Sequence, residues 1–204
     1  MTTRRSRAAS LRLRGEVLWK ANPNVSNIEI RPATDSDLAY VGSNLRAADF
    51  GEFVMSSGRD PRLAFARRAK GSADLSCGVV DGTPACIFGV MPQDGWASPW
   101  FMGTDQIEGP AVARAMLTVG RKLFSKWVAE YGHLENSVYD HNELHKKYIR
   151  ALGCELAPEP IIWGLQQAPM RTFTYVRTDG SSRRVGGTLS HPGHSGVHGG
   201  HGEL

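Results

Sequence analysis

The chain has 204 residues, of which 41% are hydrophobic and 22% are charged, and its formal net charge is +4. This length suffices for one well-cored domain with extensions, and the composition is that of a globular protein. The sequence contains no run of about eighteen apolar residues, so we expect no membrane span.

Residues 1–27 are expected to form a basic N-terminal arm ahead of the folded domain. Much of the positive charge lies in the first twenty residues, which contain a single acid. No apolar segment follows Arg4, Arg5 and Arg7, so no secretion signal is indicated. The arm could make a weak nucleic-acid contact or dock on a partner, or it could be a solvated, partly disordered extension.

The folded domain is expected over residues 28–178, and it opens with a strand and a helix. Ile28-Glu-Ile30 alternates apolar and polar side chains, which predicts a strand. Thr34 is followed three residues later by Asp37, which predicts a capped helix start. A second helix is predicted from Asp60-Pro61, because aspartate caps helices and proline is tolerated at the first helical position.

Three strands are predicted in the middle of the chain. Leu75 to Val80 and Thr83 to Val90 are rich in β-formers, and Asp81-Gly82 between them is a strong hairpin signal. Gly95 to Met102 is typical of a third strand, and it leads into a loop that contains glycine.

A long amphipathic helix is predicted over Pro110 to Glu130, because apolar residues recur there along one stripe that we interpret as core. The stripe consists of Val112, Met116, Val119, Leu123 and Trp127. The last predicted elements are a strand at Leu134 to Tyr139, a closing helix at Asn142 to Leu152, and strands at Ile161 to Trp163 and Arg171 to Arg177.

The loop before the long helix has features of an anion site. It contains Gly103-Thr104-Asp105, followed by Gln106-Ile-Glu-Gly109-Pro-Ala111. A helix start leaves backbone N–H groups unpaired at the positive end of the helix dipole, which suits a pyrophosphate, and Gly109 permits close approach. Pro110 removes one donor, however, and Glu108 adds negative charge. Glycine followed by proline is also an ordinary helix start.

The order of glycine loop, helix, strand and closing helix, with Gln106-x-x-Gly109-x-Ala111, resembles the acyl-CoA-binding half of GNAT N-acetyltransferases. The resemblance implies an α/β fold, with a mixed, mostly antiparallel twisted sheet flanked by helices. It also implies acetyl-CoA as the one expected cofactor. The residues that would bind it are Gly103, Gln106, Gly109, Ala111 and Asn142, although N-capping the closing helix would also explain Asn142.

In that family a carboxylate or water deprotonates the amine, and an acid protonates the leaving thiolate. The acid is commonly a tyrosine of the closing helix, at a place that Ile149 occupies here. Tyr148 lies one residue away and is the candidate acid. Glu135 is the candidate base, with Asp140 as the other carboxylate nearby, although Glu135 could also be a solvated strand residue.

No metal site is predicted. His141 and His145 are four residues apart, which would place them on one helical face, but no third ligand is in view and we expect two exposed imidazoles. Cys77, Cys86 and Cys154 lack any paired metal spacing. We expect them to be buried small hydrophobic residues, without a disulfide and without a nucleophilic role.

Residues 179–204 are expected to form a flexible His/Gly-rich C-terminal tail. Glycine, serine and histidine dominate this segment, so it has too little apolar surface to fold by itself. Its histidines could bind Zn²⁺ or Ni²⁺ weakly, an affinity that we interpret as incidental.

Several segments together resemble a narrower group, tailed-phage proteins similar to the internal virion protein A of T7-like podoviruses. The resemblance covers roughly residues 28–165, and its segments include Ser56-Ser57-Gly58-Arg59, which we interpret as a turn, Gly103-Thr104-Asp105 and Leu134-Glu-Asn136. It implies a virion-associated or morphogenesis protein that docks on other phage virion proteins without efficient catalysis. Such a protein would be found in the virion and, during assembly, in the host bacterial cytoplasm.

Two other functions stay open from the sequence. The alternative is an acetyl-CoA-dependent N-acetyltransferase that acts on an amine by direct transfer. In that function Gln106, Gly109 and Ala111 would bind the cofactor, and Glu135 or Tyr148 would assist proton transfer. In the third, the basic arm binds nucleic acid with an affinity that falls steeply with salt.

Overall fold

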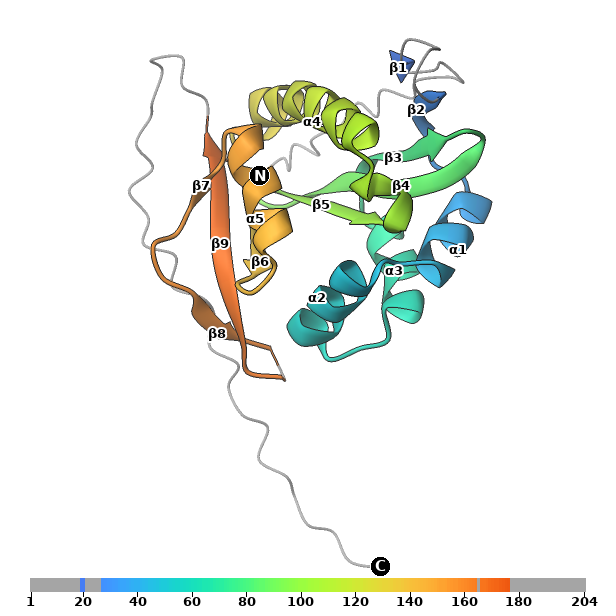
Figure 1. Cartoon of the computed structure of the whole chain (residues 1–204). Coiled ribbons are helices and arrows are strands. Elements are labelled where there is room, and N and C mark those ends of the chain that lie inside the picture. Colours follow the sequence, from blue (N-terminus) through green and yellow to red (C-terminus); the bar gives the residue numbers. More distant parts are fainter. Residues whose placement is uncertain (1–18, 21–26, 165, 177–204) are drawn as a thin grey trace, which may run out of the picture.

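One mixed sheet with helices on both faces organises the chain (Figure 1). The structure, a computed structural model, describes residues 19–20, 27–164 and 166–176. Most of the predicted arm and the whole predicted tail at 179–204 lie outside these residues, as does the proposed domain end at 178. Within the predicted arm, Trp19–Lys20 forms a short strand, β1.

The sheet has nine strands, in the order β1-β2-β3-β4-β5-β6-β9-β7, and β8 pairs with β9. Every pair is antiparallel except β5 and β6, which are parallel. The predicted mostly antiparallel α/β fold is therefore confirmed. The strands after β1 are β2 Ile28–Pro32, β3 Ala73–Val80, β4 Thr83–Pro92, β5 Ala97–Gly103, β6 His133–Tyr139, β7 Glu155–Leu156, β8 Ile161–Trp163 and β9 Ala168–Val176.

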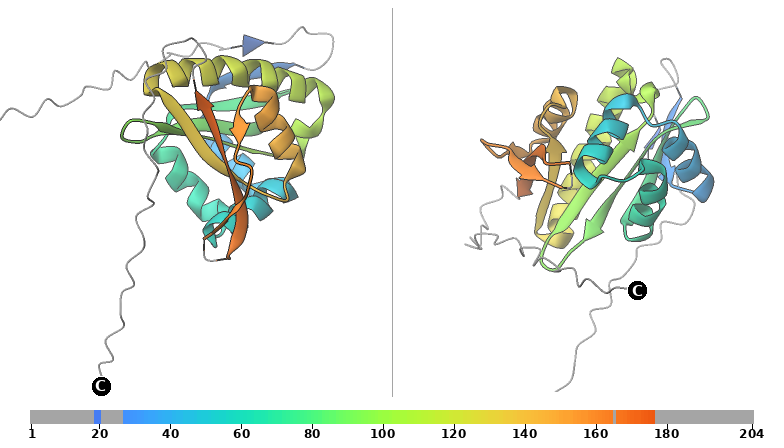
Figure 2. Two further views of the ribbon diagram at one scale, coloured as in Figure 1. Left: turned by 90° about the vertical axis from the view of Figure 1, so that its left-hand side faces the viewer. Right: turned by 90° about the horizontal axis from the view of Figure 1, so that it is seen from below.

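The helices form two layers, one on each face of the sheet (Figure 2). One face carries α4 and α5, whose buried side chains join one hydrophobic cluster. The other face carries α1, α2 and α3, which contribute Val41, Phe53 and Phe65 to a second cluster. The helices are α1 Asp35–Ser43, α2 Ala47–Ser57, α3 Pro61–Lys70, α4 Pro110–Tyr131 and α5 Glu143–Leu152, with a short 3-10 helix, η1, at Asp105–Glu108.

Local sequence signals account for several of these elements. Thr34 caps α1, and Asp37 accepts the Thr34 backbone N–H in return, so the predicted capping box is confirmed. Pro61 begins α3 as expected. Asp81-Gly82 joins β3 to β4 in an antiparallel hairpin, and both residues have positive φ.

Helix α2 was not predicted from the sequence. It lacks a capping side chain, because its N-cap residue is Arg46, and Gly51 interrupts its middle. The predicted turn at residues 56–59 does end this helix, since Gly58 adopts the left-handed conformation at its C-cap. The sequence signal for the helix end was therefore recognised without the helix that precedes it.

All three cysteines are buried, as predicted. Burial raises the pKa values of Cys77 and Cys154 to about 12, and it also raises that of Cys86. Thiols held in this protonated form are poor nucleophiles. None of the helices in the described part of the chain combines the length and apolarity needed to cross a membrane.

Candidate functional site

The two parallel strands at the centre of the sheet, β5 and β6, separate soon after they meet. They pair only at Ala97 and Leu134, whereas β4 and β5 stay in register along their whole shared length. Asn136 bridges the separated strands, because its Nδ2 donates to the carbonyl oxygen of Pro99 at 2.7 Å. A side chain thus replaces a ladder hydrogen bond where the sheet opens.

A cleft of about 380 Å³ occupies this opening. Adjacent residues of one strand line it, namely Asn136 with Ser137 on β6 and Trp100 with Phe101 on β5. Neighbouring side chains of a strand point to opposite faces of the sheet. The cleft therefore passes through the sheet, from the layer of α4 and α5 to the layer of α2 and α3.

On the α2 side of the cleft, a carboxylate and an imidazole form a hydrogen-bonded pair. Glu52 Oε2 lies 3.2 Å from His145 Nδ1 and accepts from Asn142 Nδ2 at 2.8 Å. Glu52 and His145 both line the cleft, and both are largely shielded from solvent. Nε2 of His145 has no hydrogen-bond partner among the described residues.

Electrostatics couple this pair. Burial opposes ionisation of Glu52, but His145, Asn142 and Arg46 together outweigh that effect and hold the pKa of Glu52 below the ordinary value. Burial likewise lowers the pKa of His145, but the carboxylates of Glu52 and Asp49 outweigh burial and raise that pKa above the ordinary value. The imidazole is thus a stronger base than a free histidine.

His141 is exposed as expected, but the interpretation of His141 and His145 as two exposed imidazoles on one helical face is wrong for His145 and for the shared face. Helix α5 begins at Glu143, so His141 precedes it and packs against the ring of Tyr139. The His145 side chain is only 14% exposed. In the described part of the chain, no group of three or more His, Cys, Asp or Glu is placed to hold a metal ion.

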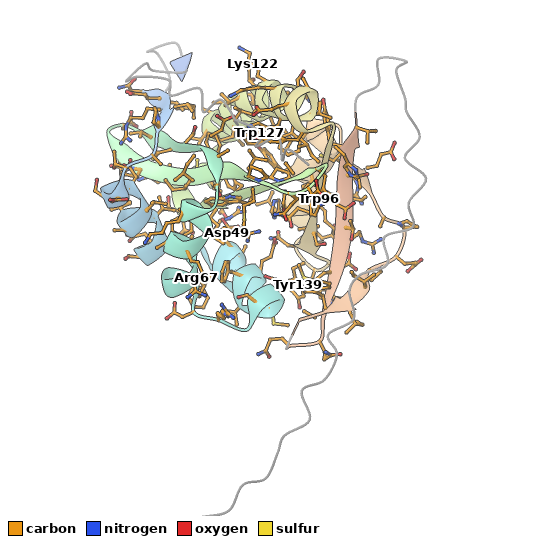
Figure 3. All side chains as sticks on the ribbon, turned by 180° about the vertical axis from the view of Figure 1, so that it is seen from behind. Asp49, Arg67, Trp96, Lys122, Trp127 and Tyr139 are labelled. Atoms are coloured by element: carbon orange, nitrogen blue, oxygen red, sulfur yellow. The ribbon has the colours of Figure 1, made fainter. Side chains whose placement is uncertain are left out.

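The backbone amide of Gly103 is already engaged. It donates to Asp49 Oδ2 at 2.7 Å, and Asp49 Oδ1 pairs with Arg46 Nη2 at 2.7 Å. Asp49 and Arg46 are buried, and Figure 3 shows Asp49 in the middle of the molecule. Arg46 also places Nη1 3.8 Å from Glu108 Oε1, which offsets the negative charge that the sequence brings to this loop.

The N-terminus of α4 is open. The first N–H groups of a helix have no acceptor within the helix, and in α4 these belong to Ala111 and Val112. The N-cap residue is Gly109, which has no side chain to accept from them. A Cβ atom added at Gly109 would make only ordinary contacts, 3.7 Å to Gln106 O and 3.8 Å to Val112 Cγ2. The packing around this position therefore does not itself require glycine.

The structure brings Gln106, Gly109 and Ala111 together around this helix end, with Gln106 exposed on η1. Asn142 is elsewhere and N-caps α5, where its side-chain oxygen accepts from His145 N at 3.1 Å. Both ends of the Asn142 amide are therefore used within the protein. The N-capping alternative explains this residue.

The two candidate catalytic residues do not share the cleft. Tyr148 lines it, and its hydroxyl donates to Met116 O at 3.1 Å. Burial raises the pKa of Tyr148, so the phenol stays protonated. Glu135 is not among the lining residues, and its Oε2 lies 3.5 Å from His133 Nε2. Asp140, the other carboxylate considered, is bound by Arg171, which holds its pKa at about 2.

Sequence reasoning missed Glu52 and Asp49. Both lie on α2, three residues apart, a spacing that places two carboxylates on neighbouring positions of one helix face. That signal becomes visible only when residues 47–57 are recognised as a helix. The pairing of Glu52 with His145 across 93 residues leaves no local sequence signal.

No protein-family model and no curated protein matches the sequence. Solved structures do match the fold. An N-acetyltransferase from Staphylococcus aureus Mu50 gives a TM-score of 0.58 at 14% identity, over 74% of this chain and 99% of that one. The yncA structure from Salmonella typhimurium, solved with its cofactor acetyl-CoA, gives a TM-score of 0.54 at 14% identity, over 76% of this chain and 96% of that one. A GCN5-related N-acetyltransferase from Kribbella flavida gives a TM-score of 0.51 at 19% identity, over 74% of this chain and 98% of that one. The described domain therefore has the fold of the GNAT acetyltransferases.

Proposed function

We propose that the chain is an acetyl-CoA-dependent N-acetyltransferase that transfers the acetyl group directly to an amine. The observation that carries the proposal is the cleft between β5 and β6, which opens on both faces of the sheet. Such a cleft allows two substrates to enter from opposite sides and meet inside. The sequence resemblance and the similarity to GNAT structures support the same reaction class.

The residues present fit the cofactor at one end of α4. The free N–H groups of Ala111 and Val112 suit a pyrophosphate, the side chain of Gln106 is exposed beside them, and Gly109 leaves space for its approach. The backbone amide of Gly103 is not available to the cofactor, because it donates to the Asp49 carboxylate. Bound acetyl-CoA would supply an activated acetyl group, which the amine nitrogen gains as it loses a proton, and CoA would leave as the thiol.

His145 is the proton acceptor in this proposal. Its Nδ1 faces Glu52, so Nε2 is the atom available to take the proton of the amine. Glu52 acts as a positioning residue, because it fixes the ring orientation and stabilises the charged imidazolium. Asn142 in turn orients the Glu52 carboxylate.

Tyr148 is the proposed donor of a proton to the leaving sulfur, because its ring lines the cleft and its hydroxyl is protonated. Donation requires the hydroxyl to leave Met116 O. Glu135 stays a prediction as a base. Its place outside the cleft lining favours His145 for that step.

The phage virion or morphogenesis role, with other virion proteins as partners and the virion and host cytoplasm as locations, remains a prediction from the sequence resemblance. One observation favours it. The Gly103 and Asn142 amides, two of the five groups expected to bind the cofactor, are used within the fold. That is what a docking module without efficient catalysis would allow. A weak nucleic-acid contact by the arm is likewise a prediction, tested by deleting residues 1–20 and measuring binding against salt.

Release of free CoA thiol in the presence of an amine panel tests the enzyme directly. We expect acetyl-CoA turnover that needs an amine and falls by about 10²-fold or more in His145→Ala, as for loss of a general base. The exposed His141→Ala variant is the matched control and should retain full turnover. Acetyl-CoA binding without turnover on any amine would favour the docking role, and Gly109→Trp should then leave particle assembly intact.

A further inference from the structure

An arginine on α3 stands in the cleft without an anionic partner. Arg68 lines the cleft and is half-buried, and its Nε is fully buried without a hydrogen bond. Its side chain forms no hydrogen bond or ion pair with the residues that the structure describes, and only its backbone carbonyl accepts hydrogen bonds, from Gly71 and Ser72. A shielded charge is normally compensated by a partner of opposite sign, because removing it from water is costly.

The guanidinium of Arg68 is held in place from one side. It lies over the ring of Trp100, with Cζ 5.8 Å from the ring centroid. Burial lowers the pKa of Arg68, against the opposing charge of Glu52, but a guanidinium stays protonated in proteins. The protein thus maintains an oriented cation in the cleft, which suits a planar carboxylate.

The position of Arg68 links it to the proposed proton acceptor. Glu52 acts electrostatically on both Arg68 and His145, so these two groups lie around one carboxylate, and all three residues line the cleft. Helix α3 covers the face of the sheet opposite α4, whose N-terminus is the proposed cofactor end. Arg68 is therefore on the side from which the amine would enter.

We propose that the acceptor is a small amine that also carries a carboxylate, an amino acid with an apolar side chain, and that Arg68 binds this carboxylate. The inference rests on the proposed function. Arg68 would hold the acid group while His145 Nε2 receives the proton of the amino group. The apolar part of the acceptor would lie against Phe53 and Met170, which also line the cleft.

The test compares amino acids with the amines that lack only the carboxylate. Acetylation of L-phenylalanine against phenethylamine, and of L-leucine against isoamylamine, is measured with the full chain and acetyl-CoA. Arg68→Gln removes the cation, and Arg67→Gln on the same helix is the control, because Arg67 is exposed at the outer edge of α3 (Figure 3). The melting temperature of each variant verifies folding. Calorimetric titration with each amino acid, without acetyl-CoA, measures binding separately from turnover.

We expect kcat/KM to favour each amino acid over its amine by about 10²-fold, and the preference to disappear in Arg68→Gln but not in Arg67→Gln. Equal acetylation of acid and amine by the wild type would overturn the inference while leaving the acetyltransferase function intact. Amino-acid binding that needs Arg68, without acetylation, would instead contradict the proposed function and keep the carboxylate site. If no amino acid either binds or is acetylated, the inference is wrong, and acetyl-CoA turnover with other amines decides the function separately.

Discussion

The side-chain amide of Asn136 reaches across to the carbonyl oxygen of Pro99, 2.7 Å away, at the point where β5 and β6 part. The same side chain accepts from the backbone N–H of Ser137 at 2.7 Å. One residue thus satisfies backbone groups that the opened ladder leaves without strand partners. This arrangement keeps the sheet continuous around a cleft that passes through it.

Replacing Asn136 by leucine, which is similar in size, should destabilise the protein. The change leaves the Pro99 carbonyl without its partner, at a cost of about 1 to 3 kcal/mol in the free energy of unfolding. Urea unfolding measures this value. Ser137→Ala is the control, because the Ser137 hydroxyl has only a long contact of 3.5 Å to Thr172 and should change stability little. Equal stability of Asn136→Leu and the wild type would show that the bridge contributes nothing.

The pH dependence of turnover should reveal the Glu52–His145 pair. His145 accepts a proton only when neutral, and its pKa is raised, so the rate should rise with pH above the ordinary histidine value of about 6.5. In Glu52→Gln the negative charge that raises this pKa is gone. The rising limb should therefore move to lower pH, while the maximal rate falls because the imidazolium is less stabilised. If the rising limb of the pH–rate profile stays at the same pH in Glu52→Gln, a group other than His145 is responsible for it.

Tyr148→Phe isolates the phenolic hydroxyl. The ring remains in the cleft and only the hydrogen bond to Met116 O is lost, so the protein should stay folded. We expect kcat to fall by about 10²-fold, the typical effect of removing a general acid, with little change in acetyl-CoA affinity. Unchanged kcat would show that the proton reaches the sulfur from elsewhere, with His145 as the nearest alternative.

Acid stability should depend on the start of α1. Arg31 Nη2 donates to Asp37 Oδ1 at 2.8 Å, and this partner together with Thr34 lowers the pKa of Asp37 to about 2. A depressed carboxyl pKa gives stability that is present above the unfolded value and lost as pH falls through the folded value. Asp37→Asn should therefore cost about 2 kcal/mol at neutral pH and flatten the loss of stability between about pH 4 and 2. The exposed Asp35→Asn is the control. A wild-type stability curve that is flat over this range would contradict the argument.

Much of the fold could be predicted because its signals are local. Thr34 and Asp37 mark a helix start within four residues, Asp81-Gly82 marks a hairpin, and the apolar stripe of α4 repeats at helical spacing. Helix α2 has neither a capping side chain nor an uninterrupted apolar stripe. We infer that packing against the sheet, more than local helix propensity, stabilises it. Its absence from the prediction removed Glu52 from consideration.

The candidate site was only partly predictable for the same reason. The open end of α4 at Gly109 is a local feature and appears in the sequence. The contacts that decide the chemistry join distant segments, with Glu52 meeting His145 and Asp49 meeting Gly103. Glu135 was chosen because it lies beside the predicted motif, but it is not among the residues that line the cleft and lies close to His133 instead.

The central claim is that the chain binds acetyl-CoA at the N-terminal end of α4, and calorimetric titration of the full chain in modest salt tests it most directly. Gly109→Trp fills the open helix end, while Gly109→Ala adds only a methyl group in ordinary contact. The account predicts saturable binding near −8 kcal/mol, about micromolar, that Gly109→Trp abolishes. It also predicts that Gly109→Ala weakens binding much less. No detectable heat with the wild type at several temperatures, or equal binding by wild type and Gly109→Trp, would contradict it.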